Sequence, residues 1–373
     1  MALKSDPQSD APTGPVATAG LIGHGGGEQA FLETAAARRM PHAWLISGPR
    51  GIGKMTLAYR MARFQLSREN GGGLFGPPED LYMAPEDPIF RRTLAGGHGD
   101  LRVIEREVNE KTKKLRGDIV VDQIRALGRF YTMTAAEGGW RVAVIDGAEE
   151  MNPNAANALL KLLEEPPGNS LLLLVSHAPG RLLPTIRSRC RHLPLRALHE
   201  DDAMAVLAQQ MPERDETERL GLSRLAEGSP GRAMAMGAEG GLKAYGELLA
   251  MVADLPELDF AAVHALGDKF NRANNEGAYR VWIDLLRLWL SRLARNSAMG
   301  GVAGGSMIGA VAGEAELFHR LTSSVGLDRW VKLWEKIGGL AMRAERVNLD
   351  RKQVVISAFM ALQSTALQNT ARQ

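Results

Sequence analysis

Residues Gly48 to Lys54 match a phosphate-binding loop, but the position that follows them does not. The spacing G-x-x-x-x-G-K-[ST] is kept by Gly48, Gly53 and Lys54, and Met55 stands where a serine or threonine belongs. In a complete loop the backbone N–H groups surround the phosphates, the lysine reaches the terminal phosphates and the hydroxyl oxygen binds Mg²⁺. Because Mg²⁺ requires oxygen ligands, the thioether of Met55 cannot replace that hydroxyl. Thr56 is one residue farther along the expected helix, where a side chain points about 100° away.

A second position that hydrolysis requires is also changed. Asp146 ends an apolar run, residues 142–145, and P-loop ATPases place the acid that holds Mg²⁺ at such a strand end. In the large ATPase class with an Asp-Glu pair here, the glutamate polarises the attacking water, but this chain has Gly147. Glu149 and Glu150 lie farther along, and their spacing favours neither as a substitute. The two changes together argue against efficient ATP hydrolysis.

The loop still keeps the groups that contact phosphate. Candidate nucleotide-binding residues are Gly48, Gly51, Gly53, Lys54, Thr56 and Asp146. We expect no cofactor to be required. The sequence leaves open whether ATP or ADP binds, and we expect any binding to depend little on Mg²⁺.

The elements that must position these residues follow from the hydrophobic pattern. Short apolar runs at 43–47, 141–145, 171–175 and 191–195 predict buried strands, and helical spacing after Lys54 and from Asn152 predicts helices between them. Strands that alternate with helices indicate an α/β domain with a parallel sheet. A strand, the glycine loop and a helix form the context that a phosphate loop requires. Residues 67–118 are rich in Gly and Pro and predict a loop or a solvated hairpin.

Beyond residue 197 the strand pattern stops and only helices are predicted. Trp282, Leu286, Trp289 and Leu293 share one helical face. We expect a disordered tail at 1–20, the α/β domain at 21–197, a small helical domain at 198–242 and an all-α domain at 243–373.

Composition excludes several protein classes. The net charge of +2 does not by itself indicate nucleic acid, so any DNA contact would be local or shared with other subunits. Cys190 is the single cysteine, which excludes an internal disulfide and a cysteine zinc cluster, and the histidines show no metal-ligand spacing. With no apolar run of about 18 residues, we expect a cytoplasmic protein without a membrane partner.

Two further motifs point to a family. A leucine-rich segment, Asn157–Pro167, is followed by the tripeptide Ser188-Arg189-Cys190. Together with the altered phosphate loop, these motifs resemble the clamp-loader subunits of the AAA+ class, and among them the bacterial DNA polymerase III delta-prime family. The resemblance runs from about residue 20 to the end and is weak in the C-terminal part. Supporting segments are His42–Leu45, Val121–Arg125, Gly228–Arg232 and Asn348–Lys352.

The resemblance implies a role for Arg189. It would be an arginine finger, with Ser188 and Cys190 as its motif neighbours, and would act in trans in the nucleotide site of an adjacent ATPase subunit. A guanidinium suits this role because it is always charged and its forked donors match phosphate oxygens. The alternative is that Arg189 only pairs with an acid at a helix end. Arg232 matches a position from which related ATPases touch nucleotide, and a helix-capping role is nearly as well supported.

The resemblance also implies a function and partners. The chain would be a stator in a hetero-oligomeric ring with gamma/tau ATPase subunits and delta, and the ring would load a sliding clamp onto primed DNA during replication. Residues 198–242 would be the lid of the AAA+ module and residues 243–373 the oligomerisation collar. Many relatives carry four zinc-binding cysteines in the stretch equivalent to residues 67–118. This chain has none there, so no zinc is expected.

The sequence leaves other functions open. The chain could be a working ATPase motor subunit of the same loader, although Met55 and Gly147 speak against it. A P-loop enzyme acting on small molecules would leave the Ser-Arg-Cys tripeptide unexplained. Lys161, Glu164 and Glu165 form either a solvated helix face or a surface used by a neighbouring subunit.

Overall fold

The computed structural model describes residues 14–37, 39–67, 78–108, 115–136, 139–272, 275–298, 309–347 and 349–367. The chain forms two compact units. The N-terminal unit comprises residues 1–206 and 227–231, and the C-terminal unit comprises 207–226 and 232–373. The expected α/β P-loop domain followed by helical regions is confirmed. The boundaries that the sequence suggested for the lid and collar stay predictions.

A five-stranded parallel sheet forms the centre of the N-terminal unit. Its spatial order is β2-β3-β4-β1-β5, and each neighbouring pair is parallel. The strands are β1 (Ala43–Ser47), β2 (Leu101–Ile104), β3 (Arg141–Asp146), β4 (Ser170–Ser176) and β5 (Arg191–Pro194). The central strands β3, β4 and β1 are almost wholly buried, as expected for a parallel sheet covered on both faces.

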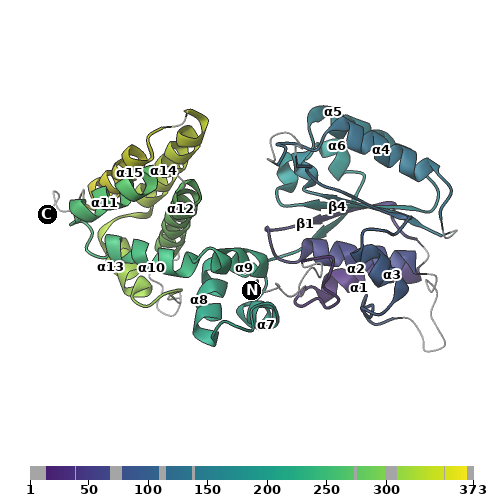
Figure 1. The fold of residues 1–373 in the computed structure, drawn as a ribbon, viewed down its shortest axis with the longest axis horizontal. Coiled ribbons are helices and arrows are strands. Elements are labelled where there is room, and N and C mark those ends of the chain that lie inside the picture. Colours follow the sequence, from purple (N-terminus) through teal and green to yellow (C-terminus); the bar gives the residue numbers. More distant parts are fainter. Residues whose placement is uncertain are drawn as a thin grey trace, which may run out of the picture. The chain divides into compact units, whose positions relative to one another are not determined.

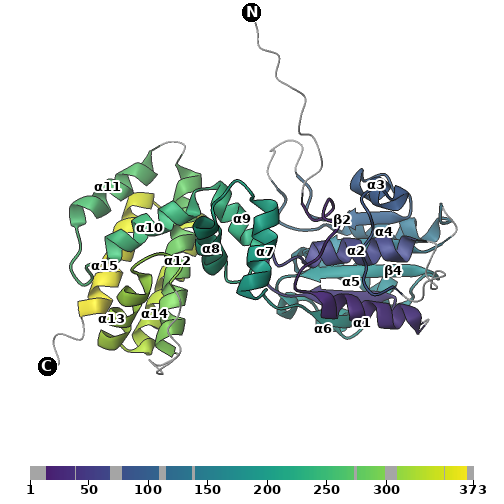
Figure 2. The same ribbon diagram turned by 90° about the horizontal axis from the view of Figure 1, so that it is seen from below.

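Helices cover both faces of this sheet (Figure 1). One layer holds α1 (Gly25–Ala36), α2 (Lys54–Leu66) and α3 (Pro88–Leu94), which Figure 2 shows in front of the sheet. The other holds α4 (Val121–Thr132), α5 (Pro153–Glu164) and α6 (Pro184–Arg187). Alternate residues of β1 enter the two cores: Trp44 and Ile46 pack on the α2 side, and Leu45 packs on the α5 side.

The segment 67–118 differs from the loop that the sequence predicted. Residues 68–77 and 109–114 lie outside the described part, but the remainder contains α3 and β2. The Asp87 side chain caps α3 by accepting from the Ile89 N–H at 2.7 Å, and Phe90 is buried. Strand β2 is only four residues long and pairs with β3 alone, at the sheet edge. So short a segment becomes a strand because β3 accepts and donates its ladder hydrogen bonds, not because of its own pattern.

Residues 1–13 of the expected disordered tail lie outside the described residues. Residues 14–20 lie against α2, where the Arg60 and Arg63 guanidinium groups donate to the carbonyl oxygens of Ala19 and Val16. Arg60 also pairs with Glu28 of α1, and both side chains are buried. These contacts hold residues 14–20 beside the helix that follows the glycine loop.

Within its described residues, the C-terminal unit contains helices joined by turns and loops, and no strand. Its core contains Trp282, Trp289, Trp330 and Phe359. The helices after β5 are α7 (Glu200–Gln210), α8 (Glu216–Ala226), α9 (Pro230–Ala238), α10 (Gly241–Val252), α11 (Phe260–Asn271), α12 (Glu276–Ala298), α13 (Glu314–Ser324), α14 (Leu327–Val347) and α15 (Arg351–Leu367).

One buried ion pair ties several of these helices together. Arg292 of α12 donates from Nε and Nη2 to the two carboxylate oxygens of Glu314 at 2.8 and 3.1 Å. The Tyr245 hydroxyl of α10 and the Ala310 N–H also donate to Glu314, and Arg292 Nη1 reaches the Arg224 carbonyl oxygen at 3.0 Å. The Glu314 side chain is fully buried. All of its charge is therefore compensated inside the helical unit.

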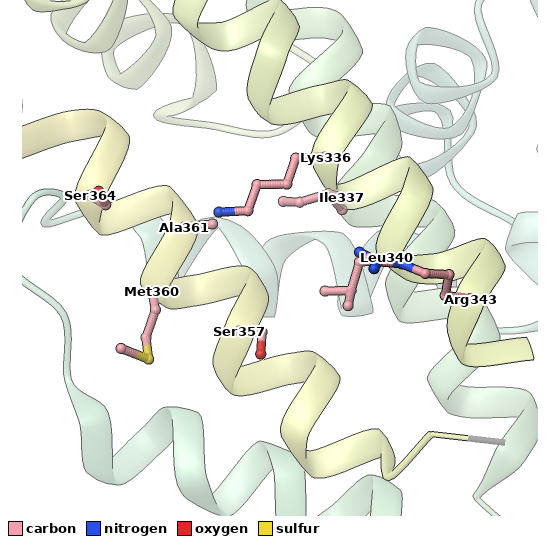
Figure 3. Close-up of a pocket in the computed structure, with 8 residues that line it drawn as sticks. All are labelled: Lys336, Ile337, Leu340, Arg343, Ser357, Met360, Ala361 and Ser364. Atoms are coloured by element: carbon pink, nitrogen blue, oxygen red, sulfur yellow. The ribbon is translucent and has the colours of Figure 1, made fainter. Parts of the chain in front are cut away.

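A groove of about 410 Å³ lies between α14 and α15 (Figure 3). Ile337, Leu340 and Met360 supply apolar side chains to it, and Lys336 and Arg343 supply positive charge.

Within the described ranges, no helix is long and apolar enough to cross a membrane.

Candidate functional site

The glycine loop has the backbone that a phosphate-binding loop needs. It joins the end of β1 to the start of α2, as the sequence predicted. Gly48, Gly51 and Gly53 have φ angles of +148°, +77° and +101°, which favour glycine. A Cβ at Gly48 would lie 2.3 Å from the carbonyl oxygen of Leu195. The loop glycines are therefore required by the conformation itself.

Neighbouring segments hold the outer side of the loop. The Ser229 hydroxyl donates to the Arg50 carbonyl oxygen at 2.7 Å, and the Gly231 N–H donates to the Gly51 carbonyl oxygen at 2.9 Å. The buried His24 ring lies 2.6 Å from the Ile52 carbonyl oxygen through Nε2. Three successive carbonyls are thus bound. The segment Gly228–Gly231 is part of this site, although the sequence offered it only as one of the segments that support the resemblance.

The start of α2 leaves hydrogen-bond donors for a ligand. Among the described residues, none accepts a hydrogen bond from the backbone N–H groups of Gly53, Lys54 or Met55. Such N–H groups at the start of a 13-residue helix form an anion-binding position. This donor set fits a phosphate group.

Lys54 is turned into the loop and is 3% exposed. Its ammonium group donates to the carbonyl oxygens of Gly48 at 2.7 Å and Pro49 at 2.5 Å. Burial lowers the pKa of Lys54 to about 8, although the nearby carboxylates of Asp146 and Glu149 act in the opposite direction. The lysine is in the expected place, and a phosphate would have to draw it away from these two carbonyls.

Asp146 ends β3 beside the loop, as predicted. Its Oδ1 atom is buried and has no hydrogen-bond partner among the described residues. Burial raises the pKa of Asp146, and the charge of Glu105 adds to this effect, whereas Lys54 opposes it. An acid in this condition is available to a ligand near the phosphate position.

Gly147 occupies the position where a catalytic glutamate would stand. Its φ angle is +71°, and a Cβ built there would lie 2.7 Å from Oε2 of Glu150. The Glu150 carboxylate is held by Arg106 at 2.7 Å and by Arg50 at 3.8 Å. Glu149 accepts from the backbone N–H groups of residues 177 and 178 at 2.9 and 3.2 Å. Both glutamates are therefore engaged in structural contacts.

The residues present do not fit Mg²⁺. Met55 holds the hydroxyl position, and its side chain packs against the core beside α2. Thr56 is buried at 8% exposure. Within the described ranges, no group of three or more His, Cys, Asp or Glu side chains could hold a metal ion. Asp146 keeps a buried carboxylate oxygen without a hydrogen-bond partner among the described residues, but the hydroxyl that would complete the usual Mg²⁺ site is missing at residue 55.

Sequence reasoning missed two polar residues at the end of β4. Ser176 is fully buried, and the neighbouring ring of His177 has Nδ1 buried with no partner among the described residues. Burial lowers the pKa of His177 to about 4, and the charge of Lys54 adds to this effect. The signal was present, because a serine and a histidine end an apolar strand that pairs with the Asp146 strand.

Arg189 follows the short helix α6 and lies on the surface, with its side chain 37% exposed. Its Nη1 donates to the Thr185 carbonyl oxygen at 3.1 Å, and its Nη2 lies 2.9 Å from Oε1 of Glu164. The Ser188 hydroxyl donates to the same Thr185 oxygen at 3.1 Å. Cys190 is buried, and burial raises its pKa to about 12.

Arg189 and the glycine loop lie at opposite ends of the strands. In a parallel sheet the C-terminal ends of all strands lie on one side, and the loop follows the C-terminal end of β1. Arg189 instead precedes β5, whose first residue, Arg191, pairs with Trp44 near the start of β1. Trp44 and Gly48 are four residues apart, which is about 13 Å along a strand. The predicted site residues thus form two separate sites in the N-terminal unit. Arg232 belongs to the C-terminal unit, and its contact with nucleotide stays a prediction.

Comparison with known proteins supports a common origin for the N-terminal part. Residues 27–199 match the family model described as DNA polymerase III, delta subunit. The DNA polymerase III subunit delta' of Pseudomonas aeruginosa is 40% identical over 190 residues, which is 51% of this chain and 53% of that protein. The gamma/tau subunit of Mycobacterium tuberculosis is 31% identical over 175 residues, 46% of this chain and 27% of that protein.

A gamma subunit-related protein of Thermotoga maritima, known from a crystal structure, is 18% identical with a TM-score of 0.36, covering 90% of this chain and 99% of that one. The chain spans about half the length of the curated delta' relatives that it matches. The stretch matched by the family model, residues 27–199, contains both sites. The delta' proteins are 32 to 40% identical over 160 to 200 residues. The resemblance seen in the sequence is thus confirmed, and through residues 27–199 this chain is related to the DNA polymerase III delta-prime subunits of the AAA+ clamp-loader family.

Proposed function

We propose that this chain is a delta-prime-like stator of a DNA polymerase III clamp loader. In this role it joins gamma/tau ATPase subunits and delta in a hetero-oligomeric ring that loads a sliding clamp onto primed DNA. The chain supplies Arg189 to the nucleotide site of the adjacent ATPase subunit. The C-terminal helices act as the oligomerisation collar.

The position of Arg189 carries this proposal. The side chain is exposed. It lies at the N-terminal ends of the parallel strands, whereas the glycine loop of the same chain lies at their C-terminal ends. A guanidinium so placed is suited to a phosphate group on another molecule, and fingers supplied in trans raise hydrolysis by about 10³–10⁵-fold. Met55, which stands in place of a serine or threonine, and Gly147, which stands in place of a glutamate, support a passive role for the chain's own loop.

The same loop supports binding of ATP or ADP without efficient hydrolysis. Its helix N–H groups and Lys54 fit phosphate, whereas Met55 does not fit Mg²⁺. Binding that depends little on Mg²⁺ follows from this donor set. A calorimetric titration of the purified chain with ADP, with and without Mg²⁺, tests it, and a steep dependence on the metal would contradict it.

The second candidate is a working ATPase motor subunit of the same loader. The similarity to gamma/tau proteins and the retained Lys54 and Asp146 favour it. ATP turnover by the isolated chain separates the two functions. A stator gives no turnover above a Lys54→Ala control, and yet the assembled loader hydrolyses ATP. Turnover by the isolated chain that the Lys54→Ala change abolishes would favour the motor.

A further inference from the structure

Two motifs that the sequence left unconnected meet in the N-terminal unit. Glu164 is the last residue of α5, and Arg189 follows α6, which packs against α5. Leu163 of α5 and Ile186 of α6 belong to the same buried core. Oε1 of Glu164 lies 2.9 Å from Nη2 of Arg189. The glutamate, whose role was open, therefore contacts the side chain on which the proposed function rests.

Helix stability does not explain a carboxylate at this place. Glu164 lies at the C-terminal end of α5, where the helix dipole disfavours a negative charge, and Glu165 follows it. Half of the Glu164 side chain is exposed, so the ion pair with Arg189 contributes little to folding. The carboxylate is better explained by what it does to Arg189.

The contacts of Arg189 orient its guanidinium group and still leave some of its N–H donors available. Nη1 donates to the Thr185 carbonyl oxygen and Nη2 to Glu164, each through one hydrogen bond. Arginine has five N–H donors, so about three remain for another acceptor. The planar group is held on one side by two acceptors from α5 and α6, and its other donors stay available to phosphate oxygens.

We propose that Glu164 is a positioning residue for Arg189. This inference rests on the proposed function, because it assumes that Arg189 serves the nucleotide of a neighbouring subunit. Glu164 keeps the guanidinium in the orientation in which its remaining donors reach that nucleotide, and it does not touch the nucleotide itself. A misplaced catalytic group can lose about a hundredfold in rate, so loss of one of two orienting contacts should be visible.

The test uses the loader reconstituted with its ATPase neighbours, and steady-state ATP hydrolysis is the measurement. Glu164→Ala is expected to lower kcat about tenfold with KM for ATP unchanged. Glu164→Gln is expected to restore most of that loss, because the amide oxygen still accepts from Arg189. Glu165→Ala removes the same charge one residue away and is expected to behave like the natural chain. In the Arg189→Ala background, Glu164→Ala should have no further effect.

The outcomes separate the two claims. If Arg189→Ala leaves hydrolysis by the loader unchanged, the proposed function itself is wrong. If Arg189→Ala lowers hydrolysis but Glu164→Ala does not, or if Glu164→Gln is as slow as Glu164→Ala, the inference about Glu164 is overturned and the proposed function stands. A fall that Glu165→Ala reproduces would also overturn the inference.

Discussion

The backbone at Gly147 predicts the effect of adding a side chain there. Its φ angle of +71° costs a non-glycine residue about 1–2 kcal/mol. A Cβ would also lie 2.7 Å from the Glu150 carboxylate, which would have to move away from Arg106. Gly147→Ala is therefore expected to destabilise the N-terminal unit by at least about 1–2 kcal/mol, a factor of roughly 5–30 in the folding equilibrium.

Native-state hydrogen exchange of β3 is the suitable assay, because it reports on the N-terminal unit without the helical unit. Amides of residues 142–145 should exchange about 5–30 times faster in Gly147→Ala, provided that they exchange through unfolding of the unit. Gly168→Ala is the matched control, because no atom lies within 4 Å of its added Cβ and its φ is not positive. Equal exchange in the two variants would show that the backbone adapts at 147. The inference that the backbone at this position favours glycine would then be wrong.

Three other predictions follow from single contacts. Met55→Thr should make ADP binding depend on Mg²⁺, which calorimetry with and without the metal would detect. Burial lowers the pKa of His177 to about 4 from an ordinary 6.5, so the unfolded chain binds this proton at a higher pH than the folded chain. The free energy of unfolding should therefore fall as the pH drops from about 6.5 to 4, and His177→Gln should remove that part of the pH dependence in denaturant titrations. Arg292→Met leaves the buried Glu314 carboxylate unpaired and should cost about 3–5 kcal/mol in urea unfolding of the helical unit, whereas adding Glu314→Leu should recover part of the loss.

Most of the sheet could be predicted because its strands carry their own signal. Strands β1, β3 and β4 are continuous apolar runs that end in polar or glycine residues, and such runs are typical of buried parallel strands. Strand β2 could not be predicted from Leu101–Ile104. Its four residues include the exposed Arg102, and only pairing with β3 makes them a strand.

In the two sites as well, some residues could be predicted from the sequence and others could not. The glycine loop, Lys54 and Asp146 were found because their chemistry depends on fixed spacing along the chain. The contacts of Ser229 and Gly231 with the loop join residues about 180 positions apart, and spacing gives no signal for them. The pair of Glu164 and Arg189 also needed the packing of α6 on α5 before it could be recognised.

The central claim is that Arg189 acts on a nucleotide held by another subunit. A structure of the assembled loader, bound to a non-hydrolysable ATP analogue, tests it most directly. The Arg189 guanidinium is expected to lie within about 2.7–3.2 Å of a phosphate oxygen in the neighbouring ATPase subunit. If Arg189 contacts only Glu164 and Thr185 and is remote from every neighbouring nucleotide, Arg189 is not an arginine finger.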